Sequence, residues 1–190
     1  MRYPEDPNLQ FLRGSRGGKI RRGYLAHYAF QVAAAAANAI KANTALADGA
    51  TTTLLEVTQP DVPRALAVKG SAAGMAGDVE VYGVDANGFP LQETFALNGA
   101  TAVQGTKAFA KVTKIVLPAR TAAGNQVQIG MTNKLGLWHA LTWDSRLVTL
   151  FDGAADAGML AIDAAEVCKN LFTPAGTLDG TKVLRIVYIV

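Results

Sequence analysis

The alternation of apolar and polar positions is clearest between residues 77 and 118, where it predicts short β-strands joined by tight turns. Val79 and Val81 alternate with acidic residues, and a second alternating run extends from 91 to 97. The pairs Asn87-Gly88 and Asn98-Gly99 follow these runs, and tight hairpin turns favour Asn and Gly because such turns need positive φ. The pattern therefore indicates a β-rich structural or binding module.

The same reading extends over most of the chain and predicts a mainly β protein. Many short strands with Gly, Pro and Asn between them are typical of an antiparallel β-sandwich, of the jelly-roll or immunoglobulin-like kind. Residues 60–64 predict a rigid turn, because each of their two prolines fixes φ and removes an N–H that a central strand needs. The expected strands are 52–57, 65–69, 78–84, 91–97, 109–117, 126–132, 146–151, 159–162 and 182–190.

Three parts of the chain follow from this reading. Residues 1–23 are expected to form an extended basic arm, residues 24–47 an Ala-rich connector that is helical or extended, and residues 48–190 the β-sandwich body. Within the connector we expect a short helix from about Phe30 to Lys41, because Ala has the highest intrinsic helix propensity.

Two predicted strands have unusual patterns. In 109–117 the alternation is interrupted by Lys111 and Lys114, which predicts a bulge or an edge strand protected by lysines. The last strand is apolar at nearly every position, so we expect it to be covered on both faces, in the core or against another copy of the chain. The residues assigned to this core or oligomer contact are Ile186, Val187, Tyr188, Ile189 and Val190.

Composition and charge add an expectation of partners. Charged residues are 17% of the chain and aromatic residues 7%, so a thin aliphatic core completed by oligomerisation is expected, with a trimer as the first choice and a dimer as the alternative. Residues 1–22 carry six basic and two acidic residues, a net charge of 6 − 2 = +4, whereas the remainder carries 12 − 13 = −1. A basic, Gly-rich arm is typical of a segment that folds against an acidic partner surface or nucleic acid, or of a solvated tail. The expected contact residues of the arm are Phe11, Leu12, Arg13, Arg16, Lys19, Arg21, Arg22 and Tyr24.

The candidate chemistry is sparse, and we expect neither an enzyme nor a cofactor or metal. Cys168 is the one cysteine and is expected in the core, while His27 and His139 lack the spacing of metal ligands. No Gly-x-Ser-x-Gly motif is present, and residues 14–19 lack the glycine spacing of a phosphate loop. Four aspartates leave a loose ion site open, although turn capping is the expected role: Asp144, Asp152, Asp156 and Asp163.

Two further readings of the arm and connector have less support. Arg21 and Arg22 precede an apolar run, as in an export signal, but twenty residues including Glu5 and Asp6 come first, and polar residues interrupt the run. The run is also too polar for a membrane span. Nucleic-acid binding is not expected, because aromatic residues are few and the body has no basic stripe.

The turns and strands together resemble small β-rich structural proteins of tailed-bacteriophage virions. The resemblance rests on residues 60–64, 77–81, 85–88, 93–101, 105–115 and 134–137 and on the final 187–190, and it covers about half of the chain. It does not extend to the arm or to 146–181.

The resemblance implies a capsid decoration, or cement, protein first, and a neck, tail or fibre component second. A decoration protein would be made in the host cytoplasm, would bind the major capsid protein on the outer surface of the virion, and would bridge capsid subunits. A secreted β-sandwich binding module is a third reading. All three readings imply a protein that binds other proteins and has no catalytic residues.

Overall fold

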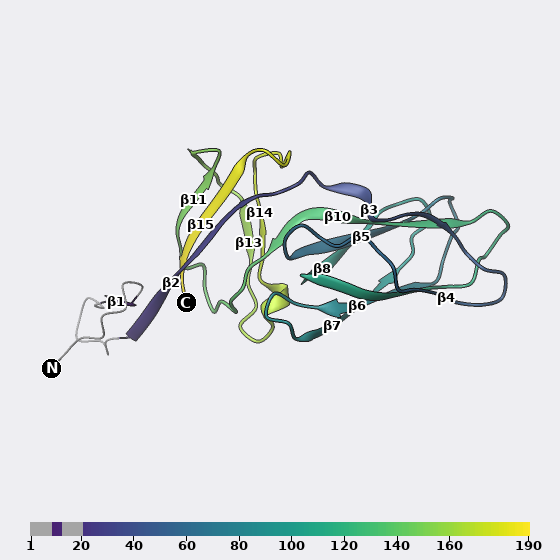
Figure 1. Cartoon of the computed structure of the whole chain (residues 1–190), viewed down its shortest axis with the longest axis horizontal. Helices are drawn as coiled ribbons and strands as arrows, with labels where there is room; N and C mark the ends of the chain where they lie inside the picture. The colour runs from purple at the N-terminus through teal and green to yellow at the C-terminus, as the bar shows by residue number, and fades with distance from the viewer. Residues whose placement is uncertain (1–8, 13–20) are drawn as a thin grey trace.

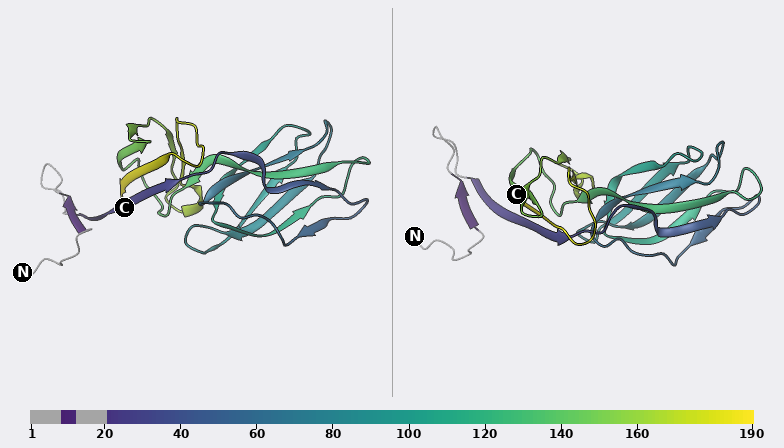
Figure 2. Two further views of the ribbon diagram at one scale, coloured as in Figure 1. Left: turned by 45° about the horizontal axis from the view of Figure 1, so that its top comes forward. Right: turned by 90° about the horizontal axis from the view of Figure 1, so that it is seen from above.

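The computed structural model describes residues 9–12 and 21–190, with side chains from Tyr24 onward. Within them the chain is mainly β, all strand pairs are antiparallel, and the helical content is one 3₁₀ turn, η1 (Val167–Lys169). The molecule is elongated, with the C-terminus and the start of β2 near one tip (Figures 1 and 2). Its strands are β1 (Leu9–Leu12), β2 (Arg21–Gln31), β3 (Ala36–Ala45), β4 (Thr52–Leu54), β5 (Arg64–Gly70), β6 (Asp78–Val84), β7 (Pro90–Ala96), β8 (Val103–Phe109), β9 (Lys111–Leu117), β10 (Gln126–Gly136), β11 (Arg146–Phe151), β12 (Ala154–Ala155), β13 (Met159–Ala161), β14 (Leu171–Thr173) and β15 (Val183–Ile189).

The larger part of the molecule, here called the large lobe, comprises residues 36–136. A four-stranded sheet in the order β4-β9-β6-β7 faces a second sheet in which β3 and β5 flank β10 and β8 forms one edge. Alternate side chains of both sheets point inward, so Val79, Val81 and Ile129, for example, are completely buried between them. Cys168 of η1 joins this cluster, which confirms the prediction of a core cysteine.

The small lobe comprises residues 24–32 and 137–190 and has a hydrophobic cluster of its own. Its main sheet has the order β1-β2-β15-β11-β12. Tyr28, Ile186 and Tyr188 point from this sheet into the cluster and meet Leu135 and Phe172, which come from β10 and β14. The strand β10 therefore serves both lobes: its first half pairs with β3 and β5, and its end pairs with β14.

A buried arginine joins the two lobes. Arg64 is 0% exposed at the start of β5, and it donates to the Thr132 carbonyl at 2.9 and 2.6 Å and to the Ala33 carbonyl at 3.2 Å. Its Nη1 lies 2.7 Å from Asp61 Oδ1, and the other oxygen of that carboxylate accepts the Ala33 N–H at 2.7 Å. The guanidinium thus ties the predicted 60–64 turn, the β2–β3 connection and β10 into one unit.

The predicted helix from Phe30 to Lys41 is wrong. The chain is in β2 up to Gln31, and after a short connection it forms β3, which pairs with β10. Helix propensity is a weak preference that tertiary packing overrides. Here the absence of a side chain on Gly130 of β10 permits a close backbone approach, because a Cβ at that position would lie 2.2 Å from the Ala36 carbonyl.

Two strand predictions also need correction. The predicted 109–117 strand is β9, which begins at Lys111, whereas Phe109 ends β8, a strand that was not predicted. β9 lies between β4 and β6 and is no edge. The predicted bulge is present, since the β6–β9 register shifts between Tyr82 and Gly83. The expectation that the last strand is covered on both faces is wrong within one copy: its inward residues are buried, and the outward ones are half-buried or exposed.

Candidate interaction surfaces

The N-terminal arm joins the rest of the molecule beside the C-terminal strand, β15. Tyr24 donates its N–H to the Val190 carbonyl and accepts the Val190 N–H, both at 2.9 Å, and from there β2 runs beside β15. β1 pairs with Arg21–Tyr24 beyond this point. The structure therefore brings two separately predicted contact regions, Tyr24 and the last strand, next to each other.

The other predicted arm residues are described in backbone or not at all. Phe11 and Leu12 lie in β1 and pair with Arg22 and Arg21 of β2. Arg13, Arg16 and Lys19 lie outside the described residues. Of the C-terminal set, Ile186 and Tyr188 are core residues, whereas Val187, Ile189 and Val190 are half-buried on the outward side.

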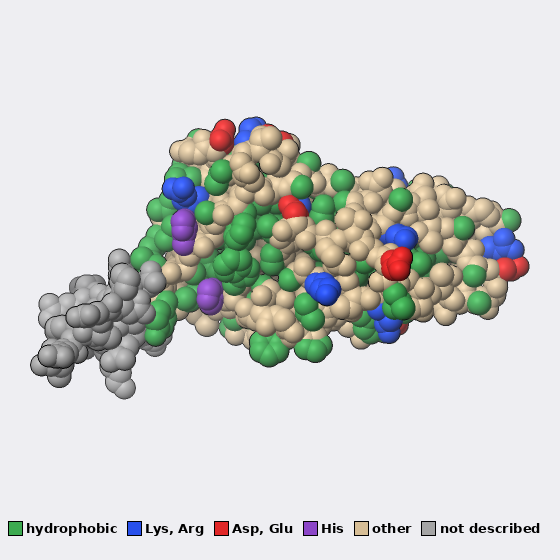
Figure 3. All heavy atoms as spheres, in the orientation of Figure 1, with side chains coloured by type: hydrophobic (Ala, Val, Ile, Leu, Met, Phe, Trp, Pro, Cys, Tyr) green, Lys and Arg blue, Asp and Glu red, His purple; other side chains and the backbone are tan. Residues whose placement is uncertain are grey.

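Several exposed apolar side chains lie in the segments next to the base of the arm. Tyr24 is 51%, Trp143 59% and Leu147 56% exposed, and Val148 pairs with Val187 on β15. Figure 3 shows hydrophobic side chains gathered over the small lobe beside the two histidines. Large apolar side chains exposed in one part of a molecule often mark an interaction site. We call these four residues, Tyr24, Trp143, Leu147 and Val148, the tip surface. Sequence reasoning missed all but Tyr24, because they sit on different segments.

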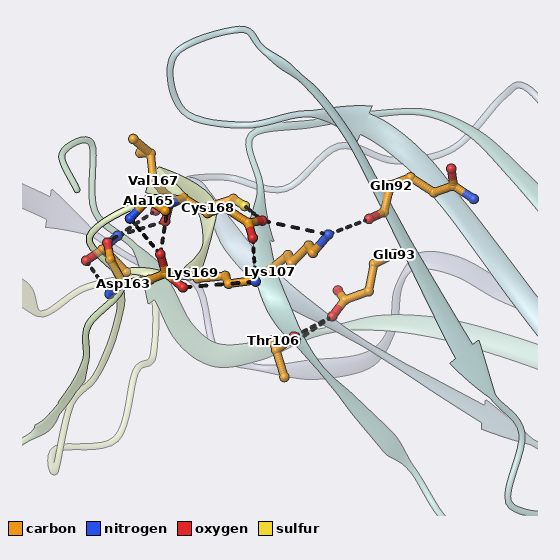
Figure 4. A network of polar contacts seen from close by, with 11 residues as sticks. Gln92, Glu93, Thr106, Lys107, Asp163, Ala165, Val167, Cys168 and Lys169 are labelled. Atoms are coloured by element: carbon orange, nitrogen blue, oxygen red, sulfur yellow. Dashed lines mark hydrogen bonds and ion pairs between the residues drawn. The ribbon is translucent and has the colours of Figure 1, made fainter. Parts of the chain in front are cut away.

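A polar groove of about 820 Å³ lies between β7 and β8 of the large lobe and η1. Lys107 reaches from β8 across the groove, 3.1 Å from the Gln92 carbonyl and 4.0 Å from Glu166 Oε2 (Figure 4). A side chain of β7 also reaches the main chain of β8: Glu93 Oε1 accepts the Thr106 N–H at 2.6 Å. Side chains thus connect two strand edges that share no main-chain ladder.

The end of the groove is a small network of charged groups around η1. Glu166 bonds Lys169 at 2.5 Å, and this bond lowers the pKa of the Glu166 carboxyl. Asp163 accepts the backbone N–H groups of Glu166 and Ala165, each at 2.8 Å, which lowers the pKa of Asp163. Burial raises the pKa of the Cys168 thiol, whose sulfur lies 3.8 Å from Glu166 Oε2. A protonated, buried thiol beside a carboxylate is a poor nucleophile.

Three of the four aspartates, Asp144, Asp156 and Asp163, have structural partners for their side chains. Asp144 forms an ion pair with Arg146 at 2.6 Å, and the hydrogen bonds from Arg146 lower its pKa. Asp156 caps three backbone N–H groups, and Asp152 occupies a turn with φ of 51°. In the part of the chain with described side chains, no group of three His, Cys, Asp or Glu residues could hold a metal ion.

The histidines have different surroundings. His139 Nδ1 lies 3.0 Å from the Tyr188 hydroxyl, and burial lowers the pKa of His139 and raises that of Tyr188 to about 12. His27 is exposed on the outward face of β2. His139 packs against the inward face of the small lobe's main sheet and His27 lies on its outward face, so the two histidines form no joint site.

Comparisons with protein-family models, curated proteins and solved structures give no match. In the described part of the chain, no helix is long and apolar enough to cross a membrane. The surfaces themselves therefore carry the functional argument: an apolar tip at the base of a basic arm, and a charged groove between two strand edges.

Proposed function

We propose that the chain is a structural protein of a tailed-bacteriophage virion, a capsid decoration protein that attaches to the major capsid protein on the outer surface and bridges its subunits. The observation that carries the proposal is the tip surface at the base of the arm. There Tyr24 is locked to Val190, so a segment with net charge +4 starts from a fixed point beside exposed apolar side chains.

This arrangement suits attachment to another protein. Apolar side chains such as Trp143 and Tyr24 are typical anchors in the centre of an interface, and surrounding charges set its orientation. Ordering an arm costs about 1–2 kcal/mol per residue, so attachment needs buried anchors besides charge pairs. The tip surface provides such anchors on a rigid sheet, while the arm provides the charges.

The β architecture supports the same proposal. A β body with two hydrophobic clusters joined by Arg64 is a stiff spacer, which is what bridging two subunits requires. We assign the large lobe to the β-sandwich class, of the jelly-roll or immunoglobulin-like kind. Many copies attached to one shell would stabilise it by multivalent contact.

The test is co-sedimentation with undecorated capsids. A chain lacking residues 1–22 should fold but bind much more weakly, because it loses the charges of the arm. Trp143→Ala should also weaken binding, by about the tenfold or more that an interface anchor contributes. Unaltered binding of both variants would refute the proposal.

Salt dependence separates charge from apolar anchoring. Replacing Arg21 and Arg22 with Gln should weaken capsid binding most at low ionic strength, because exposed charges are screened by salt. The matched control replaces Lys69 and Lys111, which lie in the large lobe, with Gln. Equal effects of the two pairs would mean that overall charge, and not the arm, governs attachment.

A further inference from the structure

We infer that the groove between β7 and η1 binds the basic arm of a second copy of this chain as an added β-strand. The contact goes beyond the proposed function, because it joins two copies of the chain and requires no capsid. Three properties of the groove carry the inference: a strand edge without a main-chain partner, a negative lining, and a position away from β1 of the same copy.

The open edge belongs to β7, the last strand of its sheet. Asp85 N–H bonds the Phe89 carbonyl and Leu97 N–H bonds the Gly77 carbonyl, which fixes the odd-numbered β7 residues as the partners of β6. In an antiparallel ladder the intervening residues direct N–H and C=O outward. Gln92 and Thr94 therefore present main-chain groups to the groove that they line. An extended segment that pairs with such an edge gains main-chain hydrogen bonds, as in β-strand addition.

The groove has room for such a segment. It runs along residues 89–94, which in extended form span roughly 20 Å, and its volume is about 820 Å³. Phe89 is 65% exposed at one end and offers an apolar contact. The Gln92 carbonyl is occupied by Lys107 Nζ at 3.1 Å, so an incoming strand would displace that ammonium toward Glu166, 4.0 Å away.

The charge of the groove complements that of the arm. Asp85, Glu93 and Glu166 line it against Lys107, which gives 1 − 3 = −2. All residues after 22 together carry only 12 − 13 = −1, so negative charge is concentrated here. The arm carries +4 and includes Phe11 and Leu12 as apolar residues. Of the segments of this chain, the arm has the greatest charge complementarity to the groove.

The geometry favours a neighbour's arm over the copy's own. β1 lies beyond the small lobe, on the side away from β6 and β7 in each view of the molecule (Figures 1 and 2). The described part of the arm, β1, therefore lies away from the groove of its own chain. Such a head-to-tail contact between copies closes into a ring when the rotation per copy permits it.

The test uses a fluorescent peptide of residues 1–22 and the full-length chain. The peptide should bind, and binding should weaken with salt. Thr94→Pro removes the outward N–H and should reduce affinity by about tenfold or more, the change produced by loss of one main-chain hydrogen bond and of strand fit. Thr94→Val keeps the N–H and should bind as the wild type does. A second pair tests charge: Glu166→Gln should weaken binding, and Glu56→Gln, which removes the same charge elsewhere, should not.

Sedimentation velocity then tests the contact between full-length copies. The wild-type chain should associate with increasing concentration, and both Thr94→Pro and deletion of residues 1–22 should give monomers. No peptide binding, or equal binding by the two Thr94 variants when both melt as the wild type, would overturn the inference. Association lost on arm deletion but retained in Thr94→Pro would also overturn it, because the arm would then dock elsewhere.

Discussion

The two lobes bury their cores in different ways. In the large lobe two sheets face each other, and residues such as Ile115 and Ile129 are completely enclosed. In the small lobe one sheet packs over strand ends and loops, and its outward face remains partly apolar and uncovered. The comparison indicates that the large lobe is built for its own stability, whereas the small lobe keeps one apolar face available for contacts.

The largest effect should follow removal of residues 186–190. This truncation takes away most of β15, the strand between β2 and β11, and two completely buried side chains, Ile186 and Tyr188. Each large buried side chain contributes about 1.5–3 kcal/mol, so the small lobe should unfold. Hydrogen exchange should show lost protection in β2 and β11. Full protection in both strands would contradict the expectation, and retained protection in β6 would show that the large lobe folds alone.

The joint between the lobes provides the second test. Arg64→Met leaves Asp61 and two carbonyls without their buried partner, a change that costs about 3–5 kcal/mol when one side of a buried pair is removed. Urea unfolding should show this loss, and a second transition should appear if Arg64 couples the lobes. The control is Arg120→Gln, which breaks an exposed pair with Asp48 and should leave the midpoint unchanged. Equal midpoints for the two variants would mean that the buried pair contributes no more stability than the exposed one, and a single transition in Arg64→Met would mean that Arg64 does not couple the lobes.

These two tests also bear on what the sequence could reveal. The alternation at 78–97 correctly predicted β6 and β7, because side chains there are sorted by a two-sided sheet. The Ala-rich run predicted a helix where the chain forms the end of β2 and most of β3. Pairing with β10 decides the conformation of β3, and that pairing depends on Gly130, far along the chain. Arg64 was assigned to the 60–64 turn, whereas it is the first residue of β5, and its burial depends on carbonyls at 33 and 132.

The surfaces were less accessible to sequence reasoning than the strands. Tyr24 was expected at a contact, whereas Trp143, Leu147 and Val148 were not, since exposure depends on where the small lobe's sheet faces solvent. The groove draws on three distant stretches, 85–94, 106–107 and 165–168. No local pattern marks such a site, because it exists only once β7, β8 and η1 lie together.

A third test, with a smaller expected effect, compares the packing of the two cores by making the same substitution in each lobe. Ile129→Val in the large lobe and Ile186→Val in the small lobe each remove one buried methylene, at a typical cost of 0.5–1.5 kcal/mol. Both side chains are 0% exposed. We expect the greater loss for Ile129, since sheets on both sides prevent the cavity from relaxing. Denaturant midpoints measure the difference, and the reverse order would mean that the small lobe is the more rigid.

The smallest effect should come from pH. Burial lowers the pKa of His139 in the folded state below its ordinary value of 6.5, so the unfolded chain takes up a proton first as the pH falls. Stability should therefore be constant above about pH 6.5 and decrease below it, before the carboxylates titrate. His139→Gln should remove this decrease in melting temperature. An unchanged profile in that variant would place the titrating group elsewhere.

The continuous strand β2 has a mechanical consequence. Its first residues pair with β1, and residues 25–31 pair with β15 along their whole length. Tension applied through the arm acts parallel to the strand, whereas the hydrogen bonds to β15 lie across it. The load is therefore shared by the whole row of bonds in shear, and no single bond opens first as it would if the strand were peeled from one end. A chain held by its arm would resist detachment forces with the strength of the entire β2–β15 ladder.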